Sequence, residues 1–296
     1  MQPGDIIEIL PVCLLDKNRA LVSELRFLAK KLGLDFGWHY LLDLTWIISQ
    51  LDKVENLSIM DVGAGVGMMQ WYLAEHGAQV ISVDRASRSD IPIRFRKRYC
   101  IKAKSKDQLL NSPLDTVIHN LQRLPGLFGK IKYLWRELLG VITFPEAPGQ
   151  VVTYDREALR LDEIPSNSLD AVVAVSALEH NPPDKLQSVV IELMRTLKPG
   201  GKLLATLGAA PDQDWFHEPS KGWNYTEETL KRIFQLAPDT PSNYSQYDEL
   251  FIQLKNCREL RYNLAKFYFA SGDTGMPWGK WDPQYQIVGV CKVKRD

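Results

Sequence analysis

Short apolar runs and longer amphipathic segments alternate through the middle of the chain. Residues 57–60, 79–83 and 168–180 are nearly continuous apolar runs, which are typical of strands in a parallel sheet that is buried on both faces. Residues 68–76 and 185–197 instead place apolar side chains every three or four positions, a period typical of helices with one buried face. This alternation predicts an α/β fold built around a parallel sheet.

A glycine-rich loop joins the first of these strands to the helix that follows it. Gly63, Gly65 and Gly67 stand at every second position within IMDVGAGVGMMQWYLAEHG, residues 59–77. Glycine permits a tight turn and the close approach of a ligand to the backbone, and the free N–H groups at the start of the helix face that ligand. A dinucleotide-binding loop needs glycine or alanine where Met68 stands, so the spacing indicates a different nucleotide-type ligand.

Two carboxylates accompany this loop. Asp61 lies two residues before Gly63, and Asp84 ends the second strand. A carboxylate at the end of the second strand of a doubly wound sheet can accept hydrogen bonds from both hydroxyl groups of a ribose. The pattern therefore predicts a ligand that contains a ribose.

Together these motifs resemble the class I S-adenosylmethionine-dependent methyltransferases. The resemblance covers about residues 57–207 and depends on DVGAGVG (61–67), Asp84, IPSNSLDAVVAVSALEH (164–180) and LKPGGKLLATL (197–207). It implies a doubly wound, mostly parallel seven-stranded sheet with an antiparallel last strand, for which residues 284–294 are suitable. It also implies S-adenosyl-L-methionine as the cofactor and methyl transfer as the reaction.

The resemblance further implies which residues hold the cofactor. Gly63, Ala64 and Gly65 of the glycine loop would line its methionine part, and Asp61 would hold its ammonium group. Asp84 would hold its ribose, and Ser176, at the end of the fourth strand, would border the same pocket. The acid that faces adenine is open between Asp155, directly after the third strand (150–154), and Asp162; Asp155 is favoured.

Two histidines are candidates for a catalytic base. His180 follows the fourth strand beside Glu179, and His217 lies in the loop after the fifth strand; in the family both places commonly face the acceptor. The cofactor supplies an activated methyl group, so the protein mainly positions the acceptor, and a base assists an oxygen acceptor. Both histidines can equally be structural. Structural roles are expected for the remaining histidines, His39, His76 and His119.

Three segments extend a minimal methyltransferase. Residues 1–56 are predicted to form an N-terminal helical cap, with helices at 20–33 and 38–51, and residues 57–296 to form the cofactor-binding catalytic domain. The insertion at 85–150 is expected to be a lid or a substrate-binding segment. Aromatic side chains in loops of the last third either wall an acceptor pocket or pack in the core, and the main candidates are Trp215, Phe216 and Trp278.

Composition and charge restrict the class of protein. The chain has 296 residues, with 36 Lys and Arg against 36 Asp and Glu, and four cysteines that form no CxxC pair. Zero net charge argues against a dedicated nucleic-acid or membrane binder, and scattered cysteines argue against a metal site. The acidic N-terminus is unlike a signal peptide, and no uncharged apolar run approaches the ~20 residues that span a bilayer, so a cytoplasmic protein is expected.

The insertion concentrates positive charge. Residues 85–150 contain 13 Lys and Arg against 5 Asp and Glu, a net charge of +8, and the rest of the chain carries −8. The excess is either a solvated basic face or a binding surface for an anionic acceptor or RNA. Residues 124–140 mix basic with large apolar side chains, which suits a lid helix or a peripheral membrane contact. If the acceptor is anionic, the side chains expected to orient it are Arg94, Arg96, Lys97 and Arg98.

Three functions are compatible with the sequence. The favoured function is a methyltransferase that acts at O, N or C of a small, anionic acceptor. An RNA or protein methyltransferase is the second, although residues 176–183, SALEHNPP, lack the NPPY-type segment of base-amine methylation. A non-catalytic binding protein is the third, and the intact glycine loop with Asp84 argues against it.

Overall fold

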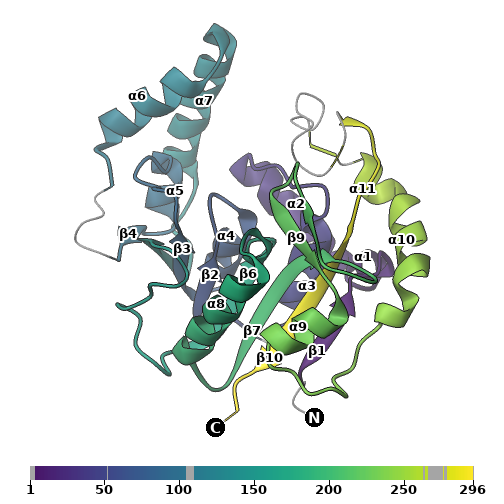
Figure 1. Cartoon of the computed structure of the whole chain (residues 1–296). Coiled ribbons are helices and arrows are strands. Elements are labelled where there is room, and N and C mark those ends of the chain that lie inside the picture. The colour runs from purple at the N-terminus through teal and green to yellow at the C-terminus, as the bar shows by residue number, and fades with distance from the viewer. Residues whose placement is uncertain are drawn as a thin grey trace. The chain divides into compact units, whose positions relative to one another are not determined.

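This computed structural model describes residues 4–51, 53–104, 110–262, 264–265, 276 and 279–295 (Figure 1). The chain divides into two compact units, one of Met1–Asp52 with Glu163–Asp296 and the other of Lys53–Asp162. Both units contain parallel strands with helices packed on them, so the predicted α/β class with a mostly parallel sheet is confirmed. Among the helices of the described residues, none is long and apolar enough to cross a membrane.

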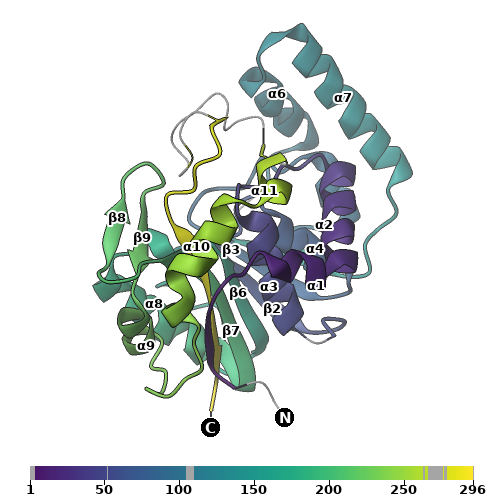
Figure 2. The same cartoon turned by 90° about the vertical axis from the view of Figure 1, so that its right-hand side faces the viewer.

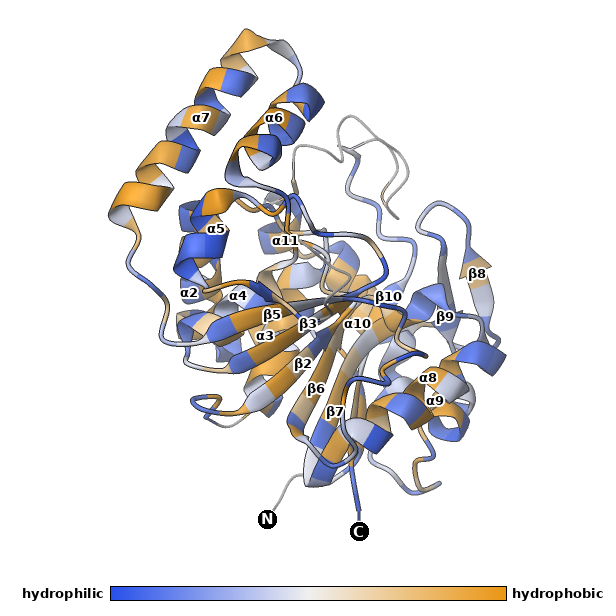
Figure 3. Cartoon of the chain, turned by 90° about the vertical axis from the view of Figure 1, so that its left-hand side faces the viewer, coloured by the Kyte–Doolittle hydropathy of each residue, from blue (hydrophilic) through white to orange (hydrophobic). Residues whose placement is uncertain are grey.

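The unit Lys53–Asp162 has four parallel strands in the order β2-β3-β5-β4. Its elements are β2 (Ser58–Val62), α4 (Met68–Glu75), β3 (Gln79–Asp84), α5 (Ile93–Arg98), β4 (Lys102–Ala103), α6 (Pro113–Arg123), α7 (Gly126–Thr143) and β5 (Gln150–Asp155). Helix α4 follows the glycine loop and ends just before Gly77, whose φ of 84° favours glycine. Figure 3 shows hydrophobic residues along β2, β3 and β5, as the apolar runs predict.

The unit of Met1–Asp52 with Glu163–Asp296 has four strands in the order β1-β10-β7-β6, with a short hairpin of β8 and β9 paired to β7. Its strands are β1 (Ile6–Ile9), β6 (Leu169–Val175), β7 (Leu197–Ala209), β8 (Trp215–His217), β9 (Gly222–Tyr225) and β10 (Gln286–Val293). Its helices are α1 (Cys13–Lys17), α2 (Arg19–Leu32), α3 (Tyr40–Gln50), η1 (Leu178–His180), α8 (Pro183–Thr196), α9 (Glu227–Ile233), η2 (Tyr244–Gln246), α10 (Tyr247–Lys255) and α11 (Arg258–Tyr262). Strand β10 is antiparallel to β7, which confirms the predicted antiparallel last strand.

The N-terminal segment differs from the expected helical cap. The two predicted helices are present as α2 and α3, which lie side by side (Figure 2), but Ile6–Ile9 forms strand β1, antiparallel to β10. Alternate residues of β1 are buried, and the side-chain amide of Asn243 bonds to both the N–H and the carbonyl of Ile9. Four residues are too few for the sequence to show this period, so the strand was not predicted.

Helix α3 packs on β10 at a point where only glycine fits. A methyl group added at Gly289 would lie 2.5 Å from Cε2 of Trp46, and this indole is fully buried. The indole cannot move aside freely, because its N–H donates to Glu8 Oε2 at 2.9 Å. The close approach of Gly289 and Trp46 therefore sets the distance between the helix and the sheet.

Gly289→Ala is expected to lower the free energy of unfolding by about 1–3 kcal/mol, since the added methyl group overpacks a fixed contact. Urea denaturation of the variant and the wild type measures the difference. Gly129→Ala is the control, because nothing lies within 4 Å of a methyl group added there. Equal midpoints for Gly289→Ala and the wild type would show that the contact can relax.

Candidate active site

Three hydrogen bonds attach the glycine loop to the carboxyl end of β3. The N–H groups of Gly63 and Ala64 donate to Val83 O at 2.9 and 3.1 Å, and the N–H of Gly65 donates to Asp84 Oδ2 at 2.8 Å. Gly63 and Gly65 have φ values of 70° and 47°, which residues other than glycine rarely adopt. The predicted loop glycines and Asp84 are therefore brought together within one unit.

Gln70 holds the loop from the inside. Its side-chain amide donates to the carbonyls of Ala64, Gly65 and Gly67 at 3.2–3.3 Å, and its Oε1 accepts from Ser82 Oγ at 2.7 Å. The side chain is fully buried. Sequence reasoning did not select Gln70, although a glutamine in the first turn of the helix after such a loop is a signal that could have been used.

Asp61 is a buried carboxylate with an unsatisfied oxygen. It is 2% exposed, and Oδ2 has no hydrogen-bond partner among the described residues. Burial raises the pKa of Asp61 to about 7, although the nearby Arg88 guanidinium opposes the shift. A buried acceptor without a donor is costly, so this position suits a cationic ligand group.

Asp155 lies beside Asp84 but is bonded to Arg88. Strands β3 and β5 are in register with Asp84 opposite Asp155. Arg88 donates to both carboxylate oxygens of Asp155 from its backbone N–H, Nε and Nη2 at 3.0–3.1 Å, and also to the carbonyl of Ser82 at 2.6 Å. Arg88 was not selected from the sequence. The alternative adenine candidate, Asp162, is exposed.

In the other unit, Ser176 and Glu179 follow β6. Ser176 has a φ of 46°, and its hydroxyl donates to Glu179 Oε1. Glu179 is 7% exposed, and its Oε2 has no hydrogen-bond partner among the described residues. Burial raises the pKa of Glu179, while the nearby His180 and His39 side chains act in the opposite direction. Two histidines therefore lie close to a buried acid.

Hydrogen bonds fix which ring nitrogen can accept a proton in His180 and His217. His180 Nδ1 lies 2.9 Å from Lys221 O, and because a carbonyl only accepts, Nδ1 carries the proton and Nε2 is free to act as a base. His217 Nδ1 accepts from Ser220 N at 3.3 Å, so its proton is on Nε2, which is then a donor. Burial lowers the pKa of His217 and keeps it neutral. Of the two predicted bases, His180 has the suitable geometry.

His39 forms a buried pair that the sequence interpretation missed. Its Nδ1 lies 2.6 Å from Asp43 Oδ2, and both side chains are almost fully buried. Burial raises the pKa of Asp43, and His39 opposes that shift. The ring of Tyr285 lies 6.2 Å from His39 and 5.2 Å from His217. The spacing of four residues in a helix is the signal that could have identified the pair.

The predicted aromatic residues lie on the β8–β9 hairpin. The rings of Trp215 and His217 are 5.6 Å apart, and those of Phe216 and Trp223 are 5.5 Å apart. Trp215 is half-buried and Phe216 is 39% exposed, so neither is in the core. Trp278 lies outside the described residues.

The four cations expected to orient an anionic acceptor have hydrogen-bond partners within their own unit, and their contact with an acceptor stays a prediction. Arg94 pairs with Glu137, and Arg98 pairs with Glu75. Lys97 donates to Val141 O. Arg96 has the most partners: the carbonyls of Ile91, Asn111 and Ser89 and the hydroxyl of Thr116. These side chains therefore hold α5 against its neighbours.

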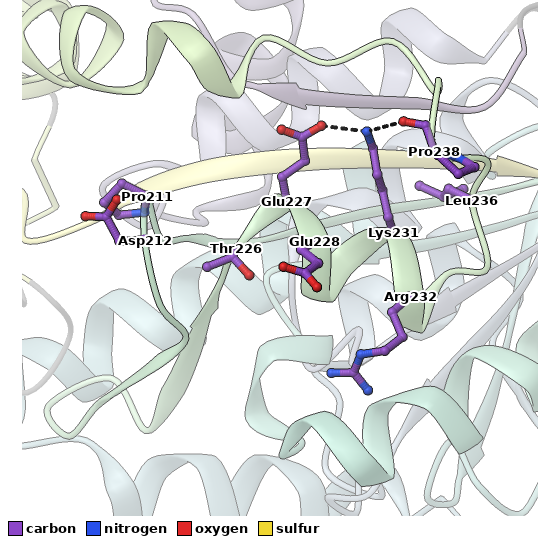
Figure 4. A pocket seen from close by; sticks show the side chains of 9 residues that line it. All are labelled: Pro211, Asp212, Thr226, Glu227, Glu228, Lys231, Arg232, Leu236 and Pro238. Carbon is purple, nitrogen blue, oxygen red and sulfur yellow. Dashed lines mark hydrogen bonds and ion pairs between the residues drawn. The ribbon is translucent and has the colours of Figure 1, made fainter.

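An open pocket of about 560 Å³ lies at the start of α9 (Figure 4). Lys231 bonds across it to Glu227 at 2.7 Å and to the carbonyl of Pro238 at 2.8 Å. None of the predicted site residues lines this pocket, so it is not part of the candidate active site. The described residues contain no cluster of three or more His, Cys, Asp or Glu side chains that could hold a metal ion.

Comparison with known proteins finds similarity to methyltransferases. Residues 143–205 match the family model described as a methyltransferase domain. The ubiquinone biosynthesis O-methyltransferase of Leptothrix cholodnii is 24% identical over 247 residues, which cover 79% of this chain and 81% of that protein. Over these matches the chain is similar to S-adenosylmethionine-dependent methyltransferases, as the sequence motifs predict. It is therefore an enzyme, and its cofactor is S-adenosyl-L-methionine.

Solved structures of low sequence identity are also similar to this methyltransferase. The cyclase SpnF is 15% identical, with a TM-score of 0.49 over 98% of both chains. The 1,6-didemethyltoxoflavin-N1-methyltransferase of Burkholderia thailandensis, solved with 1,6-didemethyltoxoflavin and S-adenosylhomocysteine, is 13% identical. Its TM-score is 0.44, over 95% of this chain and 90% of that chain.

Asp61→Asn is expected to stabilise the free protein at alkaline pH. The folded pKa of about 7 lies above the ordinary value of 3.8, so the cost of ionising Asp61 is absent below about pH 4 and is complete above pH 7. Asparagine avoids this cost, which amounts to at most about 4 kcal/mol. Urea denaturation at pH 8 and pH 4 should show a gain only at pH 8. Asp162→Asn, at an exposed acid, should show no gain; a loss of stability at both pH values in Asp61→Asn would contradict the interpretation.

Proposed function

We propose that this methyltransferase methylates a hydroxyl oxygen of a small molecule. The observation that carries the proposal is the group of side chains around Glu179, where the His39–Asp43 pair and His180 surround a buried acid. A hydroxyl oxygen is a weak nucleophile at neutral pH, so a hydroxyl acceptor needs a base to remove its proton. The similarity to an O-methyltransferase over most of both chains supports the same choice.

The cofactor is proposed to bind against the glycine loop. Its ammonium group would bond to Asp61 Oδ2, the buried acceptor that has no partner among the described residues. Its ribose hydroxyls would bond to Asp84. The predicted contact of Ser176, in the other unit, with the cofactor stays a prediction. The backbone of Gly65 is open to close approach by a ligand. Only one atom, Asp84 Oδ2, lies within 4 Å of a methyl group added at this position, at 3.8 Å.

Asp155, predicted to face adenine, is given a different role in this proposal. Both of its oxygens accept hydrogen bonds from Arg88, three in all, which gives this carboxylate a structural partner. Asp155 would instead hold the segment that follows β3, and with it the carboxyl end of the strand where Asp84 stands.

The proposed base is His39. When it is bound, the cofactor supplies a methyl group that its positive sulfur has already activated. The chain must then take the proton from the acceptor hydroxyl, and His39 Nε2 can do so while Nδ1–H remains bonded to Asp43. The carboxylate orients the ring and stabilises the imidazolium that forms. Asp43 is thus a positioning residue, and Glu179 Oε2 can accept a second polar hydrogen of the acceptor.

We propose that the acceptor is small, and we do not propose that it is anionic. Positive charge in the insertion was the reason to expect an anion or RNA, and the four cations named for this role have partners within their own unit. A small acceptor agrees with the restricted, largely buried surroundings of Glu179 and His39.

His39→Gln is expected to lower kcat for methylation of a phenol by about 10²–10⁴-fold and to leave the KM for S-adenosylmethionine unchanged. A panel of phenols, carboxylic acids and amines with tritiated S-adenosylmethionine would find the acceptor and the methylated atom. Asp43→Asn should also lower kcat, because the ring of His39 loses the carboxylate that orients it.

His217→Gln is the matched control and should retain most of the activity. His180→Gln tests the alternative base: if it loses the activity while His39→Gln keeps it, the base is His180. Methylation of amines alone would contradict the proposed hydroxyl acceptor.

A further inference from the structure

Helix α7 exposes its apolar side chains. Eight large hydrophobic residues between Leu127 and Ile142 are exposed, among them Phe128 at 82% and Trp135 at 62%. Figure 3 shows hydrophobic positions repeated along the whole of α7, and within its unit the helix lies beside α6 and α5. An ordinary surface helix buries such positions, so the exposure requires an explanation.

The packing of α7 on α5 explains why the apolar face points outward. The buried positions of α7 are Glu137 and Gly140. Glu137 forms a buried ion pair with Arg94 of α5, and it also accepts from the Arg94 backbone N–H at 3.2 Å. A methyl group added at Gly140 would lie 2.7 Å from Arg94 Cβ, so the helices are in close contact there. Turning α7 over would expose Glu137 and leave Arg94 buried without its partner, which is strongly unfavourable.

The exposed face has the charge pattern of a membrane-surface helix. At about 100° per residue, the eight apolar residues occupy an arc of about 140°. Lys130 and Lys132 lie beside the two edges of this arc, and Arg136 lies farther round on the side of Lys132. The only acid in α7 is Glu137, which is buried and paired. A helix of this kind, with an apolar face and basic borders, binds in the plane of an anionic bilayer surface.

We propose that α7 docks this protein onto an anionic lipid surface, with Phe128 and Trp135 inserted among the lipids and Lys130 and Lys132 at the headgroups. The charge complementarity favours lipid over a second copy of the chain, because two such faces would bring like charges together. The helix has 18 residues and does not meet the requirements of a membrane span, so it lies on the bilayer and does not cross it. The inference is independent of the proposed acceptor and base.

Vesicle sedimentation tests this inference with the full chain. The wild type is expected to bind vesicles of phosphatidylcholine mixed with phosphatidylglycerol, and to bind pure phosphatidylcholine about tenfold or more weakly. Binding should weaken as salt increases. Phe128→Glu combined with Trp135→Glu should abolish it, and Lys130→Gln combined with Lys132→Gln should weaken it about tenfold or more.

Matched controls separate docking from unspecific effects. Phe27→Glu changes an aromatic residue of α2 that is 69% exposed, and Lys185→Gln removes an exposed cation of α8; both should bind vesicles as the wild type does. Thermal melts should be unchanged in all variants, since none of the altered side chains is buried.

Three results would overturn the proposal. The first is that the wild type binds neither kind of vesicle. The second is that the wild type and the variant with both Phe128→Glu and Trp135→Glu bind vesicles equally. The third is that the wild type binds no vesicles but forms a dimer in analytical ultracentrifugation, and this variant does not. The last result would assign the face to a second copy of the chain.

Discussion

The attachment of the glycine loop to the end of β3 is the constraint on which the cofactor site depends. Two N–H groups of the loop bond to Val83 O, and a third bonds to Asp84. The loop can reach these acceptors only because Gly63 and Gly65 adopt positive φ values. Gln70 satisfies the loop carbonyls from the buried side, so the polar groups of the turn are bonded before any ligand arrives. The site is thus rigid, which lowers the entropic cost of binding.

Each unit also holds a buried carboxylate that is only partly bonded. Asp61 lies near the end of β2, and Glu179 follows β6. Each has one oxygen without a partner among the described residues. Burial raises the pKa of both acids. Such groups weaken the folded state unless a ligand completes their hydrogen bonds, so their presence is better explained by binding than by stability.

The sequence predicted the position of those candidate-site residues that a local pattern determines. The loop glycines are evident because only glycine suits the turn, and Asp84 because it ends a strand. The buried face of α8 agrees with its apolar period. The Arg88–Asp155 pair could not be predicted, because strand register brings together two residues far apart in the chain.

The direction of α7 was likewise beyond the sequence. Its apolar period predicts an amphipathic helix, but the period does not show which face meets the protein. The buried Arg94–Glu137 pair decides this, and it joins two helices whose contact is not visible in the sequence. The contact between His39 and Asp43 was not predicted for another reason: a single histidine beside an apolar helix is commonly structural, and its partner is not evident from the sequence.

Binding of S-adenosylhomocysteine as a function of pH tests the central claim most directly, since it examines Asp61 as the acceptor of the ligand's ammonium group. Calorimetry between about pH 5.5 and 7.5 should show the affinity rising, by at most about tenfold per pH unit below pH 7, because binding requires Asp61 to lose its proton. 5′-Methylthioadenosine, which lacks the ammonium group, should bind with little dependence on pH. An affinity for S-adenosylhomocysteine that is constant over this range, or that changes in parallel for both ligands, would contradict the account.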